Sequence, residues 1–253
     1  MKLFVSADVH GFYDHWLTAL SNAGFDVQNP DHKLLVCGDL FDRGGQAKEL
    51  QAFLLEMIEK DKIILIRGNH EDLLLDLVDN YGRYVLNVEG SKHGLNGTFQ
   101  TVLDLTGMDY YEATESLFHF RNKAEETPLI KTIIPKMLNY YETEKYIFVH
   151  SWIPLKNGNT EFNENWRNAT EKEWQVARWI NPLDCYKLGL FPKDKTLVFG
   201  HWHVSNFWWD LAPKSYEEDG KTSCYDPFIT NEIIALDART VVSKKVNVVV
   251  LEV

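Results

Sequence analysis

The stretch Leu35-Val36-Cys37-Gly38-Asp39-Leu40-Phe41-Asp42-Arg43-Gly44-Gly45 determines how the rest of the chain is interpreted. An apolar run of β-type residues ends at a glycine, and Asp39, Asp42 and Arg43 follow it. Carboxylates at the end of a buried strand repel one another and lose hydration unless a cation compensates them. A metal ion would do so, and the neighbouring guanidinium suits an anionic ligand. The stretch therefore predicts a strand that ends in a site for metal and anion.

Four further apolar runs end in possible metal ligands. They are Lys2 to Ala7 before Asp8 and His10, Ile63 to Ile66 before Asn69, His70 and Glu71, Tyr146 to Val149 before His150, and Thr196 to Phe199 before His201 and His203. A spacing of two places Asp8 and His10 on one face of an extended chain. Ligands collect beyond the carboxyl ends of parallel strands. The repetition therefore predicts one shared site.

Size and charge limit the class of protein. The chain has 253 residues and is 45% hydrophobic, which is enough for a full core in a single domain spanning residues 1–253. It contains only eight prolines, so extended disorder is not expected. Its formal net charge of -11 disfavours general binding to nucleic acid or to anionic membranes, because such binding needs Lys and Arg. An anionic substrate would then need a locally positive site, which bound metal would provide.

Cysteine usage and hydropathy predict the compartment. Cys37, Cys185 and Cys224 have no paired spacing and are expected to be reduced thiols. The apolar run before Asp8 is too short for a signal-peptide core, and no run approaches the roughly 20 apolar residues of a membrane span. We therefore expect a soluble, cytoplasmic protein.

Helical periodicity alternates with the first strands. Apolar residues recur at helical spacing from Tyr13 to Leu20 and from Gln46 to Lys60, which predicts parallel strands joined by crossover helices. From about Gly82 to Tyr141 the strand pattern stops, and we expect a helical insertion over one side of the sheet. The apolar stripe from Ile130 to Tyr141 predicts one continuous helix within it.

The C-terminal part returns to short β-type runs. These are Thr222 to Tyr225, Glu232 to Leu236 and Val246 to Val253, and a hairpin closing a second sheet is the simplest expectation. The acidic segment Glu217 to Gly220 predicts an exposed turn.

Taken in order, the motifs resemble those of the calcineurin-like metallophosphoesterases. The matching stretches are Asp8-Val9-His10, Gly38 to Gly44, Gly68 to Glu71, Val149-His150 and Gly200 to His203. The Asp-Arg-Gly ending and the run Arg67 to Glu71 are similar to the phosphoprotein phosphatase branch. That branch includes the phage protein phosphatases and the bacterial symmetrical diadenosine tetraphosphatases, and Leu95 to Thr101 resembles an Asn-Gly element of these members.

The resemblance implies a fold and a pair of metal sites. The expected fold is an α/β sandwich of four layers, α/β/β/α, with two mixed sheets. Two divalent ions are expected, with Mn²⁺ favoured over Fe, Zn or Ni, and the Asp, His and Asn donors suit such ions. The implied ligands are Asp8, His10, His203 and a bridging Asp39 for the first ion, and Asn69, His150 and His201 for the second.

The resemblance also implies catalytic and substrate-binding residues. His70 would protonate the leaving-group oxygen, and Asp42 would orient the imidazole of His70. Arg43 would bind phosphate oxygens together with Asn69. A second phosphate-binding arginine is expected after the fourth motif, and Arg178 is favoured over Arg167 because Trp179 follows it.

The predicted activity is hydrolysis of phosphoric esters or anhydrides by metal-bound hydroxide, without a phosphoenzyme. The substrate would be a phosphoserine or phosphothreonine protein, a dinucleoside polyphosphate or a small phosphomonoester. His203 departs from the protein phosphatases, which generally lack it, and so weakens the narrow assignment to protein substrates. One rival is a phosphodiesterase or nuclease, which the acidic composition disfavours. Another is a non-catalytic regulatory protein, which the complete ligand set and His70 disfavour.

Several other residues are expected to be structural. Arg67 is assigned as an ion-pair partner, and ordinary surface or packing roles are expected for the histidines His15, His32, His93 and His119. The aromatic residues after the last motif could stack on a nucleobase, but core packing is the favoured interpretation for Trp202, Phe207, Trp208 and Trp209.

Overall fold

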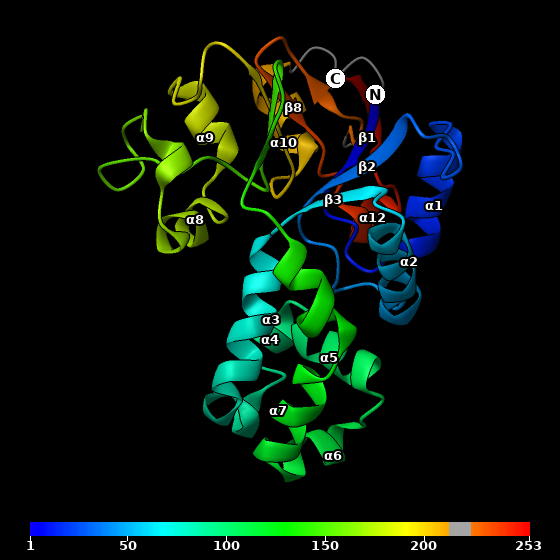
Figure 1. The fold of residues 1–253 in the computed structure, drawn as a ribbon. Helices are drawn as coiled ribbons and strands as arrows, with labels where there is room; N and C mark the ends of the chain where they lie inside the picture. Colours follow the sequence, from blue (N-terminus) through cyan, green and yellow to red (C-terminus); the bar gives the residue numbers. More distant parts are fainter. Residues whose placement is uncertain (213–223) are drawn as a thin grey trace.

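Two mixed sheets lie face to face in the computed structural model, which describes residues 1–212 and 224–253 (Figure 1). The first has the order β3-β2-β1-β9, in which β1, β2 and β3 are parallel and β9 is antiparallel to β1. Its strands are β1 (Lys2–Ser6), β2 (His32–Cys37), β3 (Ile63–Ile66) and β9 (Val249–Glu252).

The second sheet has the order β4-β5-β6-β8-β7. Its three central strands are parallel, and the two edge strands are antiparallel to their neighbours. The strands are β4 (Tyr141–Glu142), β5 (Tyr146–Phe148), β6 (Thr196–Phe199), β8 (Ile233–Ala235) and β7 (Phe228–Ile229).

Apolar side chains fill the space between the sheets. Leu3, Val5 and Leu35 from the first sheet pack in one buried cluster with Phe148 and Val198 from the second. The outer faces of the sheets are also covered by apolar side chains of helices. Coverage of both faces explains why the strands read as continuous apolar runs and not as alternating ones.

Helices form the two outer layers. The first sheet is covered by α1 (Tyr13–Asn22) and α2 (Ala47–Glu59), and the second by α8 (Glu171–Ala177), α9 (Pro182–Lys187) and α10 (Val204–Leu211). Shorter elements are η5 (Trp166–Asn168) and α12 (Thr240–Ser243). The predicted α/β/β/α sandwich with two mixed sheets is therefore confirmed.

The helical insertion extends away from the sheets (Figure 1). It follows α3 (Asn69–Asn80) and contains η1 (Tyr81–Arg83), η2 (Val85–Asn87), α4 (Lys92–Leu95), α5 (Thr98–Thr106), α6 (Tyr110–Glu115) and α7 (Leu117–Glu125). Its helices α5 and α7 pack against α3, and α5 also contacts α2. The expectation that it lies over the sheet was therefore wrong, because α3 supplies the apolar face on which it packs.

The predicted helix from Ile130 to Tyr141 was also wrong. A π-type turn at Leu129–Ile133 and a 3₁₀ turn at Ile134–Lys136 replace it, with Pro135 at the start of the second turn. Proline lacks the backbone N–H that a continuing helix needs. The chain then becomes extended, and Leu138 forms backbone bonds with Leu65 and Arg67 at the edge of β3.

A C-terminal hairpin closes the edge of the second sheet, as expected, but it joins β7 and β8, which pair antiparallel. The run Val246 to Val253 contributes β9, which pairs with β1 in the first sheet, whereas Glu232 to Leu236 contributes β8 of the second. Cys224 and Tyr225 are not in a strand, and Thr222 and the turn predicted at Glu217 to Gly220 lie outside the described residues. In the part of the chain that the structure describes, no helix has the length and apolar character needed to span a bilayer.

We expect the packing between the sheets to provide much of the stability. Leu35 is fully buried there, so Leu35→Ala should cost about 2–5 kcal/mol in the free energy of unfolding by leaving a cavity. Urea denaturation measures this loss. Leu86→Ala is the matched control, because Leu86 is 99% exposed, and its effect should stay within about 0.5 kcal/mol. Equal effects of the two substitutions would contradict this account.

Candidate metal and phosphate site

Loops that follow the parallel strands of both sheets meet at one edge of the sandwich. Asp8 follows β1, Asp39 follows β2 and Asn69 follows β3, while His150 and His201 follow β5 and β6. Backbone bonds join these loops: Asp8 N–H donates to Gly38, His10 N–H to Asp39 and Gly200 N–H to His150. The topology thus brings together residues that are far apart in the sequence.

The backbone of these loops is unusual. Positive φ angles between 50° and 71° occur at six site residues, namely Asp8, His10, Asp39, Asp42, Arg43 and His201. Left-handed backbone is uncommon outside glycine and costs of order 1–3 kcal/mol per residue. Such conformations persist only where the surrounding structure enforces them. Here they turn side chains from separate loops toward a common centre.

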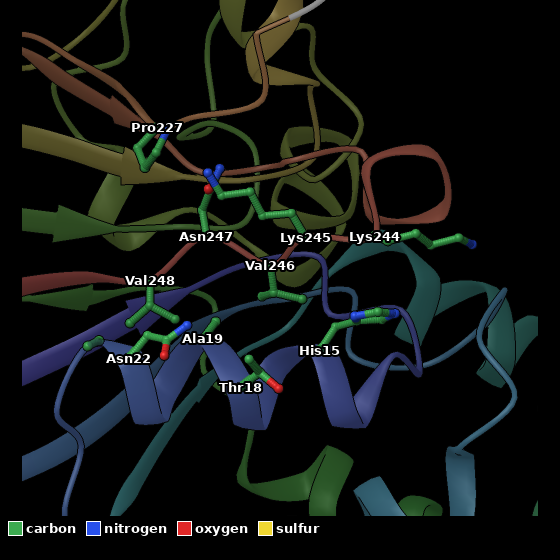
Figure 2. A pocket seen from close by; sticks show the side chains of 11 residues that line it. His15, Thr18, Ala19, Asn22, Pro227, Lys244, Lys245, Val246, Asn247 and Val248 are labelled. Carbon is green, nitrogen blue, oxygen red and sulfur yellow. The ribbon is translucent and has the colours of Figure 1, made fainter.

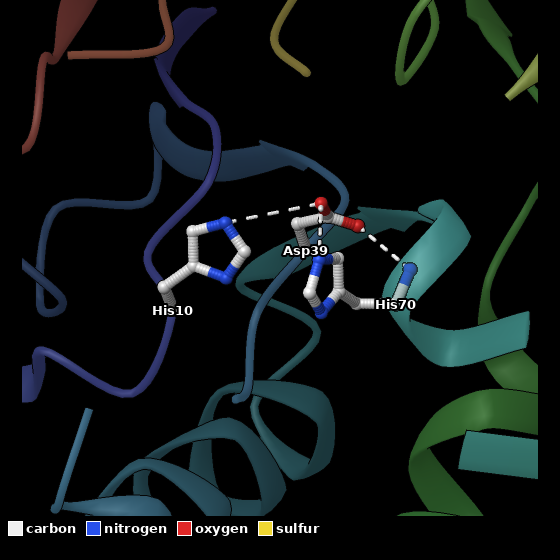
Figure 3. A group of neighbouring side chains, drawn as sticks. All are labelled: His10, Asp39 and His70. Carbon is white, nitrogen blue, oxygen red and sulfur yellow. Dashed lines mark hydrogen bonds and ion pairs between the residues drawn. The ribbon is translucent and has the colours of Figure 1, made fainter. Parts of the chain in front are cut away.

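Asp39 lies at that centre and is 2% exposed. Its Oδ2 is 3.9 Å from His10 Nε2 and 3.8 Å from His70 Nε2, as Figure 3 shows for these three residues. Its Oδ1 instead lies 3.4 Å from His150 Nε2. The two oxygens of one carboxylate therefore face two different groups of donors, as a carboxylate shared by two cations would.

The second group consists of imidazole nitrogens and an amide oxygen that lie close together. Burial lowers the pKa of His150, which favours the neutral imidazole, and its Nδ1 donates to the carbonyl of Cys37 at 2.8 Å. Its Nε2 lone pair therefore faces Asn69 Oδ1 at 2.7 Å, and His201 Nδ1 lies 2.9 Å from the same oxygen. Convergent nitrogen and oxygen lone pairs fit a divalent cation.

The electrostatics of the ligand candidates support this fit. Burial lowers the pKa of His10 well below its usual range and that of His201 to about 3. Burial alone would raise the pKa of Asp39, but the surrounding histidines outweigh it and lower the pKa. Neutral imidazoles beside an ionised carboxylate are the protonation states that metal binding requires. Two three-residue groups share the carboxylate: His10, Asp39 and His70, and Asp39, His150 and His201.

Two predicted metal ligands lie beside these groups. Both carboxylate oxygens of Asp8 accept the backbone N–H of His201, at 3.1 and 2.9 Å. Burial raises the pKa of Asp8 well above its usual range, and the nearby Asp237 and Asp39 add to the shift. His203 Nε2 lies 3.9 Å from Asp237 Oδ2. Metal ligation by Asp8 and His203 stays a prediction.

Asp237 is a site residue that the sequence analysis missed. It follows β8, is 4% exposed and faces His203, and burial raises its pKa. The available signal was the same as at the other strand ends, because the apolar run Ile233 to Leu236 ends in this carboxylate. It was overlooked because no recognised motif surrounds it.

Glu71 connects two of the ligand loops. Its buried carboxylate accepts the backbone N–H groups of Gly68 at 2.7 Å, Asp39 at 3.2 Å and Leu40 at 3.0 Å. Burial, with the added repulsion of Asp39, raises its pKa to about 7. Glu71 thereby fixes the loop after β2 against the start of α3.

His70 and Asp42 form a buried pair. His70 Nδ1 lies 2.7 Å from Asp42 Oδ2, and the hydroxyls of Thr98 and Thr101 donate to the two oxygens of Asp42, each at 2.7 Å. Burial lowers the pKa of His70, but Asp39 and Asp42 outweigh this effect and raise it overall. The Asn-Gly element of the insertion therefore holds the carboxylate that orients His70.

Arg43 lies across the same site. Its Nη1 is 3.0 Å from His10 Nε2, and its Nη2 is 3.0 Å from His70 Nε2 and 3.4 Å from Asn96 Oδ1. A planar guanidinium in this position can present its N–H groups to the oxygens of a phosphoryl group.

Three other arginines, Arg67, Arg167 and Arg178, are engaged by carboxylates. Arg178 is 2% exposed, and its guanidinium donates to Asp72, Glu171 and Asn139. Its guanidinium contacts these protein groups, and phosphate binding by Arg178 stays a prediction. Arg167 pairs with Glu142. Arg67 Nη2 lies 2.6 Å from Asp72 Oδ1, which confirms its expected structural role.

The aromatic residues after the last motif are divided between core and surface. Phe207 is fully buried and packs against Phe199 and Phe228, as predicted. Trp208 donates its indole N–H to the carbonyl of Asp226, whereas Trp209 is 58% exposed. Packing is thus the main role of Phe207, while Trp209 contributes to the surface.

A separate cavity of about 420 Å³ lies between α1 and the segment 244–248 (Figure 2). Its lining includes His15, Lys244, Lys245 and Asn247. None of the side chains at the strand ends lines it. The cavity is therefore separate from the site described above.

Comparisons with known proteins agree with this site. The family model described as calcineurin-like phosphoesterase matches residues 1–205. Bis(5'-nucleosyl)-tetraphosphatase PrpE [asymmetrical] of Halalkalibacterium halodurans is 27% identical over 160 residues, which are 60% of this chain and 58% of that protein. Serine/threonine-protein phosphatase 2 of Salmonella typhimurium is 31% identical over 122 residues, which are 48% of this chain and 49% of that protein.

Solved structures resemble the whole chain at low sequence identity. A structure assigned provisionally as a diadenosine tetraphosphatase has a TM-score of 0.56 at 14% identity and covers 99% of this chain and 89% of that one. A cold-active protein tyrosine phosphatase has a TM-score of 0.50 at 16% identity, with coverage of 99% and 75%. These likenesses show the fold, whereas the match over residues 1–205 shows that the chain belongs to the calcineurin-like phosphoesterase family.

Proposed function

We propose that the chain hydrolyses phosphoric esters or anhydrides with the help of two divalent metal ions. The observation that carries this proposal is the position of Asp39, whose two buried carboxylate oxygens face separate donor groups. The family match supports the same reaction class.

The donor groups define which residues would hold the ions. His10 and Asp39, together with Asp8 and His203, would hold the first, and Asn69, His150 and His201 would join Asp39 at the second. Such a pair of ions, when bound, supplies an activated water and neutralises charge on the phosphoryl oxygens. We propose Mn²⁺, with Fe, Zn or Ni as alternatives, because the nitrogen and oxygen donors suit these ions.

His70 is proposed as the general acid. Asp42 holds its Nδ1, and Nε2, on the side of Arg43, is the nitrogen that would give a proton to the leaving-group oxygen. The raised pKa of His70, caused by Asp39 and Asp42 against the effect of burial, favours the protonated form that an acid needs. The hydroxyls of Thr98 and Thr101 keep Asp42 in the required orientation.

Arg43 and Asn69 are proposed to bind the phosphoryl oxygens. Gly97, in a left-handed turn with φ +86°, packs directly against the backbone of Arg43. A Cβ at Gly97 would lie only 2.6 Å from Arg43 N. The insertion therefore places both Asp42 and Arg43. Nothing larger than glycine fits between these two segments without moving one of them.

The proposed substrates are phosphorylated proteins or dinucleoside polyphosphates. Both classes occur in the names of the curated relatives, of which this chain spans 58% and 49% in the two cases given above. A phosphodiesterase or nuclease activity is the weaker candidate because of the net charge of -11. We also propose a cytoplasmic location, supported by the free thiols of Cys37, Cys185 and Cys224. We further propose a single domain, supported by the buried apolar cluster that the two sheets share.

His70→Asn tests the general acid. With para-nitrophenyl phosphate and Mn²⁺, kcat should fall by about 10²–10⁴-fold, because the proton donor is lost. His119→Asn is the matched control, since His119 is exposed on the insertion, and it should retain full turnover. Wild-type turnover that survives a chelator would contradict metal dependence.

Asp39→Asn tests the shared carboxylate by metal content, independently of turnover. Plasma mass spectrometry of protein dialysed against Mn²⁺ should show a fall from about two ions per chain to one or fewer, because both groups lose a charged ligand. Asp61→Asn serves as the control, as the Asp61 side chain is 91% exposed. Retention of two ions by Asp39→Asn would refute the shared role.

Gly97→Ala and Gly107→Ala form a matched pair. Both glycines have left-handed φ angles, +86° and +74°, so each substitution should cost about 1–2 kcal/mol of stability. A Cβ at Gly107 meets nothing within 4 Å, whereas one at Gly97 meets Arg43. Turnover of para-nitrophenyl phosphate should therefore fall at least about tenfold only in Gly97→Ala. Equal turnover in folded samples of both variants would show that the turn does not position Arg43.

A further inference from the structure

A small cavity adjoins the proposed metal site on the side of His10. It measures about 240 Å³ and is lined by His10, Arg43, His203, Asp237, Arg239, Thr240, Val241 and Val242. This volume is below the roughly 300–1,000 Å³ of sites that enclose whole ligands. The cavity therefore suits one group of a substrate whose reacting part lies at the metals.

Arg239 is the residue of this cavity that the proposed reaction does not use. Its backbone is held firmly, because its N–H donates to Asp237 Oδ1 at 2.7 Å and its carbonyl accepts from Val242 and Ser243. Its φ of 52° is left-handed, a conformation that arginine adopts rarely. The strand end after β8 and the start of α12 thus present this exposed side chain at a defined place.

The guanidinium of Arg239 has no acceptor among residues 1–212 and 224–253, in contrast to Arg67, Arg121, Arg167 and Arg178, which are paired with carboxylates. The carboxylate nearest to it in sequence, Asp237, directs one oxygen at the Arg239 backbone and the other toward His203. The uncommitted guanidinium of Arg239 thus lines the same cavity as Arg43, which itself contacts His10 and His70, so two planar cations border this space.

We propose that this cavity binds the phosphate group next to the scissile one, and that Arg239 thereby selects for phosphoanhydride chains such as those of dinucleoside polyphosphates. This inference rests on the proposed hydrolase function. Arg43 borders both His70, the proposed general acid, and the cavity, so a ligand that fills both places carries two anionic groups close together, as a polyphosphate does. Val241 and Val242, 41% and 52% exposed, provide apolar surface beyond Arg239 for the organic part of such a substrate.

The test compares two substrates in Arg239→Gln, which removes the charge and adds no new backbone strain. In Mn²⁺, the loss of kcat/KM should be at least about tenfold larger for diadenosine tetraphosphate than for para-nitrophenyl phosphate, and should appear mainly in KM. Arg239→Lys should restore part of the loss, because it keeps the charge but not the planar fork. Arg83→Gln is the matched control: Arg83 is exposed on the insertion, and both substrates should be unaffected.

A binding measurement separates this inference from the proposed function. Calorimetric titration in Mn²⁺ with the bis-methylene analogue of ATP, in which both the α,β and the β,γ bridging oxygens are replaced, should show affinity reduced at least about tenfold in Arg239→Gln. If the wild type turns over neither substrate, the proposed function fails and this titration still decides the role of the cavity. Equal losses for both substrates, or unchanged analogue affinity, would each overturn the inference.

Discussion

Repulsion between buried carboxylates is the constraint on which the structure of the site depends. Asp8, Asp39 and Asp237 come from three strand ends and lie close enough for Asp39 and Asp237 each to raise the pKa of Asp8. Their burial removes the hydration that would otherwise stabilise charge. The surrounding histidines compensate Asp39, and the remaining negative potential makes the centre attractive to divalent cations. Without a cation, the repulsion between these buried carboxylates would be only partly compensated.

The two-sheet architecture creates this convergence, and the insertion completes it. Loops from both sheets supply the possible metal ligands, whereas Thr98, Thr101 and the turn at Gly97 hold the Asp42 and Arg43 segment from the other side. The insertion therefore supplies contacts to the candidate site and also forms a separate lobe packed on α3. A role in positioning explains why its Asn-Gly element accompanies the metal motifs in the sequence.

Local sequence patterns predicted most of the site but could not predict side-chain partners. Arg178 illustrates the limit, because its spacing relative to the fourth motif says nothing about Asp72, which is 106 positions away and accepts from its guanidinium. The predicted helix from Ile130 to Tyr141 failed for a related reason. Its apolar stripe was real, yet Pro135 and the pairing of Leu138 with the edge of β3 produced an extended segment.

The sequence by itself determined an α/β fold with parallel strands and most of the strand-end residues, because apolar runs ending in Asp, Asn or His record both burial and ligand chemistry in a few consecutive positions. Only the tertiary structure decided which oxygen of Asp39 faces which histidine, that Asp237 joins the site, and that β9 pairs with β1. These features depend on contacts between segments up to about the full chain length apart, as the bond between Met1 and Val253 shows. Such contacts arise from packing in three dimensions, which periodicity and spacing along the chain do not encode.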